Sequence, residues 1–414
     1  MEPKIRFKGY MFGWVSEAIG LYYNFKNGLN KSKEYFGFGT PIVNFTDVFN
    51  NRVLDYASLK GRVFVTKEEI ANYSVQKGDL FFTRTSETLE EIGYPSVMLS
   101  DSPQTVYSGF VLRGRAINND PLVDVFKSYV FFTTSFRKEM IRKSSMTTRA
   151  LTSGNRLKEM IFTYPKAEDE QFKIGNYFLT LDNKIQTTSK KLESLKKLKS
   201  ASLVAMFPQQ GKTTPKVRFK GFEGEWKTPS IGDVFELRNG YTPSKIVKEF
   251  WEGGTIPWFR MEDIRMNGGF LKDALQHITP LAVKGAGLFE KNSIILATTA
   301  TIGVHAMLIA DSLANQQFTN FKVRKSLSDE YIDEFIYYSF FKIDEWSKNN
   351  TNSGGLLSVN MPLLVKQSFL TPCKEEQQAI ATFFRSLDRK IALETARLEK
   401  LKQIKLACLD KMFV

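Results

Sequence analysis

An internal repeat is the feature that most constrains how this chain of 414 residues can fold. Residues 170–207 match residues 376–413 without a gap, and 17 of the 38 aligned positions are identical. A shorter match opens each half, where PKIRFKG at 3–9 and PKVRFKG at 215–221 differ at one position. Because such self-similarity marks repeated structural units, we expect two related halves that begin alike and end alike.

The repeated tails carry apolar residues every three or four positions, the period of one helix face. No proline interrupts either tail, so each predicts a helix of about 38 residues, about 57 Å long at 1.5 Å per residue. One such stripe is also typical of a core helix, but two long matching copies favour mutual pairing as a coiled coil. The predicted seam consists of Ile174, Phe178, Leu181, Ile185, Thr188, Leu192 and Leu195, with Ile380, Phe384, Leu387, Ile391, Glu394, Leu398 and Leu401.

The segments that precede the helices are typical of mixed α/β domains. Short apolar runs, such as 79–83 and 293–297, are separated by turn residues, and helices are predicted near 122–142 and 329–348. The predicted fold class is α+β: two mixed α/β domains separated by two long antiparallel helices that form a coiled coil, in a pseudo-two-fold tandem repeat. The predicted boundaries are 1–166 for the first domain, 167–211 for the first helix and linker, 212–372 for the second domain and 373–414 for the second helix.

The charge balance favours an anionic partner, because 58 Lys and Arg against 44 Asp and Glu give a net charge of +14. Cys373 and Cys408 have neither Cys-x-x-Cys spacing nor a nearby histidine cluster, which disfavours a disulfide framework or a zinc site. The N-terminal sequence lacks the apolar core of a signal peptide, and the longest stretch free of charged residues, 292–310, contains polar residues. We therefore expect a soluble, cytoplasmic protein that does not associate with membranes.

The sequence contains no familiar catalytic motif. His277 and His305 are the only histidines, so no His-Glu-x-x-His zinc motif exists, and no Gly-x-Gly-x-x-Gly is present. The sequence also lacks an Asn-Pro-Pro or Asp-Pro-Pro followed by an aromatic residue, the tetrapeptide with which amino-methylases grip an exocyclic amine. We therefore predict no catalytic and no metal-binding residues.

Polar and basic residues recur in predicted turns at comparable places in both halves. Arginine can bind guanine and Asn or Gln can bind adenine, while Lys, Ser and Thr serve phosphates. Each run alone is more typical of a solvated loop, but the recurrence favours DNA binding. The candidates in the first domain are Arg84, Thr85, Ser86, Arg113, Arg115, Arg142, Lys143, Ser145, Thr147 and Arg149. Those in the second are Arg238, Asn239, Tyr241, Lys245, Trp258, Arg260, Arg265, Asn315, Gln316, Gln317, Lys348, Asn350 and Asn352.

The motif EQ-x-x-I-x-x-x-F-x-x-L-D-x-K-I heads each predicted helix, at Glu170 and at Glu376. Trp14 and Trp226 follow the two opening motifs at the same spacing. With these tryptophans, the Gly-Tyr-Thr-Pro-Ser at 240–244 and the Ile-Pro-Trp-Phe-Arg-Met-Glu-Asp-Ile at 256–264, the layout resembles the specificity (S) subunits of type I restriction-modification systems. The resemblance covers essentially the whole chain. The first domain, however, lacks a clear Ile-Pro-Trp equivalent.

The resemblance implies a non-catalytic subunit whose two target-recognition domains each read one half of a bipartite double-stranded DNA site. It also implies two modification subunits that bind S-adenosylmethionine and methylate adenine, and restriction subunits that use ATP and Mg²⁺. This chain itself is expected to bind no cofactor, and its helices are expected to set the spacer length and to dock the methylase subunits.

Two alternatives stay open at the level of sequence: a coiled-coil adaptor without DNA specificity, and a self-sufficient DNA-modifying enzyme. A DNA reader should lose affinity steeply as salt rises, whereas an adaptor should prefer no duplex sequence. Methylation by the purified chain with S-adenosylmethionine alone would favour the enzyme.

The long helices predict a measured spacing between the two halves of the DNA site. Inserting or deleting one helical turn between Leu181 and Leu198 should change the tolerated gap between the half-sites and leave each half-site sequence intact. Mapping of methylated sites for each variant measures both properties, and an unchanged gap would contradict the prediction.

Overall fold

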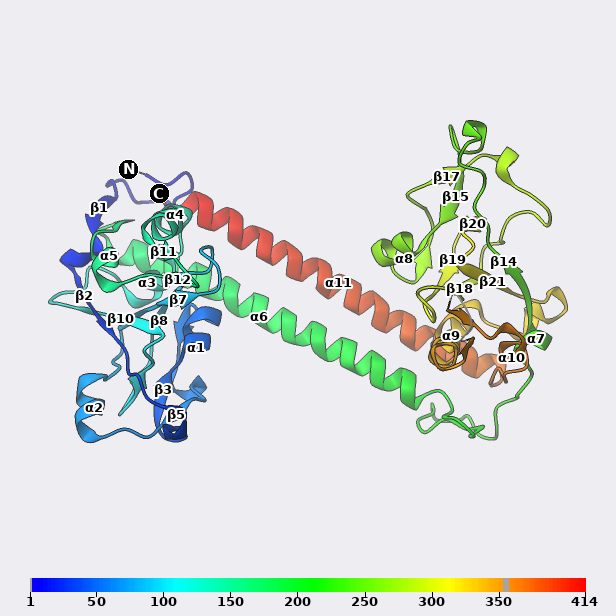
Figure 1. Cartoon of the computed structure of the whole chain (residues 1–414), viewed down its shortest axis with the longest axis horizontal. Helices are drawn as coiled ribbons and strands as arrows, with labels where there is room; N and C mark the ends of the chain where they lie inside the picture. Colours follow the sequence, from blue (N-terminus) through cyan, green and yellow to red (C-terminus); the bar gives the residue numbers. More distant parts are fainter. Residues whose placement is uncertain (1, 353–356) are drawn as a thin grey trace. The chain divides into compact units, whose positions relative to one another are not determined.

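The computed structural model describes residues 2–352 and 357–414, and the chain divides into two compact units (Figure 1). Unit 1 comprises Met1–Lys190 and Thr395–Val414, and unit 2 comprises Lys191–Glu394. The two long helices, α6 (Glu168–Ala205) and α11 (Lys374–Met412), each contribute residues to both units.

Unit 1 contains short strands and short helices in mixed order. Its strands are β1 (Val15–Ala18), β2 (Tyr23–Asn27), β3 (Phe36–Val43), β4 (Val53–Leu54), β5 (Arg62–Val63), β6 (Leu80–Thr83), β7 (Thr85–Ser86), β8 (Pro95–Met98), β9 (Val106–Tyr107), β10 (Val111–Ala116), β11 (Ser145–Met146), β12 (Ala150–Leu151) and β13 (Ile161–Tyr164). Its shorter helices are α1 (Phe45–Asn50), α2 (Lys67–Asn72), α3 (Asp124–Val130), α4 (Thr134–Lys143) and α5 (Gly154–Lys158), with 3₁₀ turns η1 (Ile19–Leu21), η2 (Lys33–Tyr35) and η3 (Tyr56–Ser58).

Unit 2 has the same kind of composition. Its strands are β14 (Phe235–Asn239), β15 (Ile256–Phe259), β16 (Phe270–Leu271), β17 (His277–Ile278), β18 (Ile294–Ala297), β19 (His305–Leu308), β20 (Leu313–Ala314), β21 (Phe318–Val323), β22 (Thr351–Asn352) and β23 (Ser358–Val359). Its shorter helices are α7 (Ile231–Val234), α8 (Met261–Asn267), α9 (Asp333–Asn349) and α10 (Met361–Leu364), with 3₁₀ turns η4 (Lys248–Phe250), η5 (Pro280–Ala282) and η6 (Lys325–Glu330).

The two units share one strand topology. A five-stranded sheet has the order β2-β10-β6-β8-β4 in unit 1 and β14-β21-β18-β19-β16 in unit 2, and in both only the last pair is parallel. A three-stranded sheet has the order β5-β3-β9 in unit 1 and β17-β15-β20 in unit 2, with one antiparallel and one parallel pair in each. The structural repeat therefore runs through the middles of the halves, where sequence similarity has faded.

The predicted strand runs are confirmed at 79–83 and 293–297, where β6 and β18 lie at the centre of their sheets. All four residues of each strand are buried, and the run of consecutive apolar residues is typical of a strand covered on both faces.

The helix predicted near 122–142 is interrupted, which corrects the prediction. α3 ends at Val130 and α4 begins at Thr134. The Thr133 hydroxyl donates to the Val130 carbonyl at 3.0 Å and accepts from the Phe136 backbone N–H at 3.4 Å. This one side chain ends the first helix and caps the second.

The helix predicted near 329–348 begins later, at Asp333. The preceding backbone N–H, that of Ile332, donates to the side-chain oxygen of Gln377 at 3.0 Å. The start of α9 is therefore fixed by a residue at the head of α11.

In unit 1, α6 and α11 run antiparallel. The Tyr177 hydroxyl of α6 lies 3.3 Å from the Cys408 Sγ of α11. Further along both helices, the Lys405 Nζ of α11 donates to Asp182 Oδ1 of α6 at 2.5 Å. The same aspartate accepts a hydrogen bond from the Tyr129 hydroxyl at 2.9 Å, so a tyrosine, an aspartate and a lysine join α3 to both long helices.

The end of α11 also completes the core of unit 1. Phe413 has its ring centroid 6.1 Å from that of Trp14, 5.5 Å from Phe126 and 5.6 Å from Phe178, and all four side chains are buried. The core of unit 1 thus combines residues from both ends of the described chain.

In unit 2, α6 and α11 again run antiparallel, because Lys191 and Lys199 pair with Glu394 and Asp388, each at 2.5 Å. Asp388 also accepts a hydrogen bond from the Tyr338 hydroxyl at 2.7 Å, which repeats the tyrosine, aspartate and lysine arrangement of unit 1. The antiparallel pairing is confirmed within each unit. The seam residues that are buried are Ile174, Phe178, Leu181, Thr188, Leu192, Ile380, Phe384, Leu387, Glu394 and Leu398, while Ile185, Leu195, Ile391 and Leu401 are half-buried.

A buried ion pair ties each opening motif to the head of a long helix. The Arg6 guanidinium donates to both carboxylate oxygens of Glu170, at 2.7 and 2.8 Å. Arg218 does the same to Glu376, at 2.7 Å for both bonds. Each glutamate side chain is only 1% exposed, so its charge depends on the arginine for compensation.

Removal of Arg218 should destabilise unit 2 strongly. The Arg218→Ala substitution leaves the Glu376 carboxylate buried without its cation, so we expect a loss of about 3–5 kcal/mol in the free energy of unfolding. Chemical denaturation measures it, with Lys220→Ala, an exposed lysine two residues away, as the control expected within about 0.5 kcal/mol of the parent. Equal effects of the two substitutions would contradict this role of the ion pair.

Candidate nucleic-acid interface

In unit 1 two candidate runs come together on one small sheet. The hairpin β11–β12 adds to β7, with Ala150 opposite Ser86 and Leu151 opposite Thr85. The sheet therefore brings the run 84–86 to the run 142–149, which the sequence separates by more than 50 residues.

The polar groups of this hairpin are partly free to meet a ligand. Thr147 and Arg149 are exposed, and the Arg149 guanidinium lies 3.1 Å from the Glu87 carboxylate in a solvated pair. Arg142 is exposed as well, whereas Lys143 pairs with Glu159 at 3.1 Å. Exposed guanidinium and hydroxyl groups on one hairpin suit contacts with a phosphate backbone.

Three segments meet where β6 ends, at Arg84. The Arg84 backbone N–H donates to the Phe110 carbonyl at 2.9 Å, and the Arg84 carbonyl accepts from the Thr152 N–H at 3.1 Å. The Arg84 guanidinium also donates to the Gly109 carbonyl at 3.2 Å. We call this meeting point of Arg84, Phe110 and Thr152 the junction of unit 1.

Arg113 and Arg115 lie outside this cluster and have internal partners. Arg113 is 8% exposed, donates to the Ser74 carbonyl at 2.6 Å and lies over the Tyr107 ring at 5.2 Å. Burial lowers the pKa of the Arg113 guanidinium below its usual value. Arg115 binds both carboxylate oxygens of Asp79, at 2.7 and 2.6 Å. Both side chains therefore serve the packing of unit 1.

Unit 2 has an equivalent junction where β18 ends, at Thr298. Its backbone N–H donates to the Gln317 carbonyl at 2.9 Å, and its carbonyl accepts from the Val359 N–H at 2.8 Å. An isolated bridge between Thr299 and Ser358 joins the hairpin β22–β23 to this point. The hairpin carries one of the candidates, Asn352, whose Nδ2 lies 3.5 Å from Ser358 Oγ. A second candidate, Asn350, lies between α9 and β22, and its Nδ2 donates to a helix carbonyl.

The candidate loops of unit 2 are also brought together. The Tyr241 N–H donates to the Ala314 carbonyl at 2.9 Å, and the Trp258 indole N–H donates to the Tyr241 carbonyl at 3.0 Å. Asn315 Nδ2 donates to Gln317 Oε1 at 3.3 Å, which holds the amide-bearing loop in place. Trp258 is buried and supports this cluster, while Gln316 is exposed on it and accepts a hydrogen bond from a threonine hydroxyl at 2.5 Å.

The remaining candidates of unit 2 divide into internally bonded and exposed side chains. Arg238 donates to two backbone carbonyls at 2.7 and 3.1 Å, Asn239 Oδ1 accepts from Thr319 at 3.0 Å, and Arg260 pairs with Glu262 at 3.2 Å. Among the exposed side chains are Lys245, Arg265 and Lys348.

The structure corrects the expectation that the first domain lacks an Ile-Pro-Trp equivalent. On β3 of unit 1, Pro41 pairs with Arg62 of β5 and Ile42 with Val106 of β9. On β15 of unit 2, Pro257 pairs with His277 of β17 and Trp258 with Leu313 of β20, so the two strands have the same register. The counterpart of Ile-Pro-Trp is therefore Thr-Pro-Ile at 40–42. The tryptophan position is filled by isoleucine, which a buried strand accepts equally well.

Sequence reasoning also missed candidates in the first domain. The strand register matches the loop 108–110 to the loop 315–317, so Phe110 stands where unit 2 has Gln317. The two units also share a short sequence pattern, Asn-Gly-x-x-x-Ser-Lys, at 27–33 and at 239–245. This pattern would have identified the exposed Lys33 as the counterpart of the candidate Lys245. A Cβ at Gly28 would lie 2.2 Å from the Ser108 carbonyl oxygen, and one at Gly240 would lie 2.3 Å from that of Asn315. Both loops therefore need glycine.

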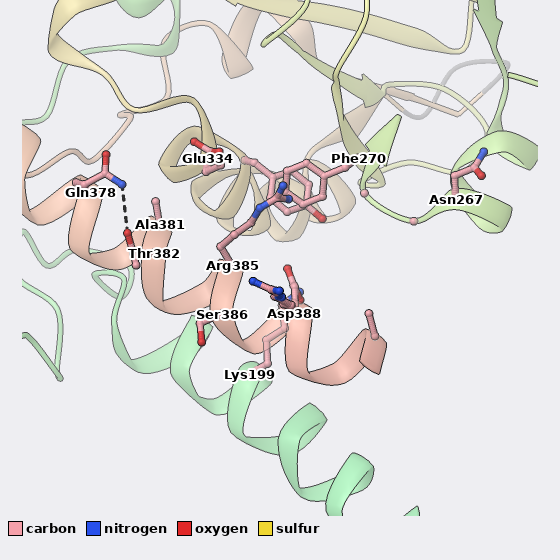
Figure 2. A pocket seen from close by; sticks show the side chains of 15 residues that line it. Lys199, Asn267, Phe270, Glu334, Gln378, Ala381, Thr382, Arg385, Ser386 and Asp388 are labelled. Carbon is pink, nitrogen blue, oxygen red and sulfur yellow. Dashed lines mark hydrogen bonds and ion pairs between the residues drawn. The ribbon is translucent and has the colours of Figure 1, made fainter. Parts of the chain in front are cut away.

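A groove of about 840 Å³ in unit 2 runs along α11 (Figure 2). The Arg385 guanidinium lies 4.4 Å from the centre of the Phe270 ring, which itself lies 4.4 Å from the Tyr337 ring. Gln378 Nε2 donates to Thr382 Oγ1 at 3.2 Å on the same face of α11. The groove thus offers a cationic and polar helix face beside aromatic rings.

Residues 2–352 and 357–414 contain no group of three His, Cys, Asp or Glu side chains that could hold a metal ion. No helix in the same part of the chain has the length and apolar character needed to cross a membrane.

Comparison with known proteins identifies the class. Residues 223–403 match the family described as type I restriction modification DNA specificity domain. The chain is 46% identical over 158 residues to the type I restriction enzyme EcoprrI specificity subunit of Escherichia coli, covering 38% of this chain and 39% of that one. It is 30% identical over 195 residues to the MjaIX specificity subunit of Methanocaldococcus jannaschii, covering 46% and 44%. The chain thus spans less than half the length of these two relatives.

The fold is shared over the whole chain with the crystal structure of a type I restriction-modification S subunit from M. genitalium. The TM-score is 0.61 at 15% identity, covering 100% of this chain and 99% of that one. The class of protein is therefore that of two-domain chains with paired long helices. Residues 223–403 belong to the type I restriction modification DNA specificity domains, and the resemblance to S subunits is confirmed.

The internal partners of Arg115 predict that it acts on stability. Arg115→Ala leaves Asp79, which is 2% exposed, without its cation, so we expect a loss of about 3 kcal/mol in the free energy of unfolding. The matched control is Arg142→Ala, because Arg142 is exposed and its removal should change the value by less than about 0.5 kcal/mol. Thermal unfolding compares the two variants, and a stable Arg115→Ala protein would refute the assignment.

Proposed function

We propose that this chain is the non-catalytic DNA-specificity subunit of a type I restriction-modification complex, in which each unit reads one half of a bipartite DNA site. One observation carries the proposal: unit 1 repeats the strand order and the junction of unit 2, and unit 2 contains most of the segment that matches the DNA specificity family. Two such units in one chain suit two half-sites.

The side chains at the junctions have the chemistry that DNA reading needs. Asn315, Gln316 and Gln317 place three amides on one loop of unit 2, and amides can pair bidentately with adenine. Arg149 on the hairpin of unit 1 and Lys245 in unit 2 are exposed cations suited to phosphates. Phosphate contacts would give affinity, and the loops would give sequence preference.

The long helices are proposed to set the spacing between the half-sites. α6 has 38 residues and α11 has 39, so each is about 57 Å long. This exceeds one duplex turn of about 34–36 Å, so two readers joined by such helices can address successive turns of one DNA. The gap between half-sites would be measured by helix length, and its sequence would not be read.

The chemistry is proposed to reside in partner subunits. Two modification subunits would bind S-adenosylmethionine and methylate adenine, and restriction subunits would use ATP and Mg²⁺, while this chain binds no cofactor. An adenine amine inside a duplex is inaccessible, so a modification subunit would flip the base while this chain holds the flanking bases in register. The complex would act on DNA in the cytoplasm.

The groove along α11 is proposed to receive one modification subunit. Arg385 and Arg389 line it from the helix, and Phe270 and Tyr337 line it from the domain, so it offers both charge and aromatic surface. The second copy is proposed to bind the repeated helix α6, where Leu179 and Asn183 stand at the positions of Arg385 and Arg389.

The proposal predicts that each unit controls one half-site independently. Replacing residues 1–166 by the corresponding segment of a homologue should change the bases of one half-site and leave the other half-site and the gap unchanged. Long-read mapping of methylated adenines in a host with the parent chain, with the chimaera and without either gives the answer.

The matched control for this experiment replaces residues 212–372 instead and should change the other half-site. Changes in both half-sites from either chimaera would argue against independent readers. Identical methylation with and without the chain would reject the proposed function.

A further inference from the structure

Phe110 is an apolar side chain exposed at the otherwise polar junction of unit 1. Its ring is 56% exposed, although it lies in a loop next to Arg84, Ser108 and Gly109. The two ends of this loop belong to β9 and β10, whose apolar residues Tyr107 and Val111 are fully buried. The phenylalanine is therefore the one apolar residue of this short connection that meets water.

The backbone around Phe110 is held on both sides. Its N–H donates to the Ser108 hydroxyl at 3.3 Å, and its carbonyl accepts from the Arg84 N–H at 2.9 Å. The neighbouring Gly109 N–H donates to the Leu29 carbonyl at 2.8 Å. These bonds fix the backbone of the loop, so the Phe110 side chain leaves it from a defined point, and the side chain is exposed to solvent there.

The structural repeat shows which residue occupies the same place in unit 2. Val111 pairs with Thr83 as Phe318 pairs with Ala297, so the residues before them, Phe110 and Gln317, are equivalent. Gln317 also gives its carbonyl to the end of the central strand, through the Thr298 N–H at 2.9 Å. The same backbone arrangement thus carries an aromatic side chain, Phe110, in unit 1 and an amide side chain, Gln317, in unit 2.

We propose that Phe110 is a specificity-determining residue that contacts the C5-methyl group of a thymine in the half-site read by unit 1. This inference rests on the proposed function. In the major groove the thymine methyl is the apolar feature of the base edges, and an apolar side chain is its natural partner, whereas an amide suits adenine. The two half-sites then differ because equivalent positions carry different chemistry.

The surroundings of Phe110 favour DNA over a protein partner. A stable protein interface buries about 800 Å² on each side, far more than one ring supplies. The exposed Arg149 lies on the hairpin that leads to the same junction, and an exposed cation on this hairpin suits a contact with a phosphate.

The test uses the full chain assembled with its modification subunits and a duplex that carries its mapped target. Each thymine of the half-site read by unit 1 is replaced in turn by uracil, which removes only the C5-methyl group. One replacement should weaken binding by the parent about fourfold, the equivalent of about 0.8 kcal/mol for one buried methyl group.

Phe110→Ala should bind the thymine and uracil duplexes equally well. The matched control is Phe38→Ala, because Phe38 is 55% exposed in the same unit but lies on β3, and this variant should keep the fourfold difference. Thermal unfolding of both variants should equal that of the parent, since both rings are exposed.

The inference is overturned if no thymine of that half-site is sensitive to uracil, if that half-site contains no A·T pair, or if Phe110→Ala keeps the full sensitivity. Equal loss of sensitivity in Phe38→Ala overturns it too. Failure of the proposed function has a different signature, because a complex that prefers no duplex sequence at all would reject both ideas together.

Discussion

Two buried glutamates hold the architecture together. Glu170 and Glu376 head the long helices, and each is only 1% exposed and bound through two hydrogen bonds by an arginine from an opening motif. A carboxylate in such a place is tolerated only when its charge is compensated, so the start of each half must fold onto the end of its own domain. This requirement explains why the motifs PKIRFKG and PKVRFKG are so alike in the two halves while the segments between have diverged.

The long helices and the domains are joined by repeated polar contacts. Tyr129, Asp182 and Lys405 in unit 1 have the same arrangement as Tyr338, Asp388 and Lys199 in unit 2, and in each the aspartate accepts from both partners. In both units the lysine comes from the helix that runs antiparallel to the one bearing the aspartate. The contacts between the long helices and the domains are therefore the same in the two units. The units differ in the side chains of the loops at the junctions.

Most of the frame could be predicted from the sequence, because helical and strand periods are local signals. The seam from Ile174 to Leu401 and the strands β6 and β18 follow from spacing alone. The candidate site was less predictable, since a cation's role depends on distant partners: Arg115 is engaged by Asp79 and Arg113 by Ser74, both more than 30 residues away. The counterpart of Trp258 was hidden because Ile42 fills the same buried strand position, without the indole N–H that Trp258 donates to the Tyr241 carbonyl.

Unit 1 is assembled from two distant stretches of the chain, since Thr395–Val414 lies with Met1–Lys190 and Phe413 sits among Trp14, Phe126 and Phe178. During synthesis on the ribosome, unit 1 therefore cannot complete its aromatic core until the end of α11 has been translated. Unit 2, whose residues are contiguous, has all its parts earlier. Unit 2 is therefore completed before unit 1, although unit 1 is begun first, and the apolar surface that Phe413 later covers is exposed for longest during synthesis.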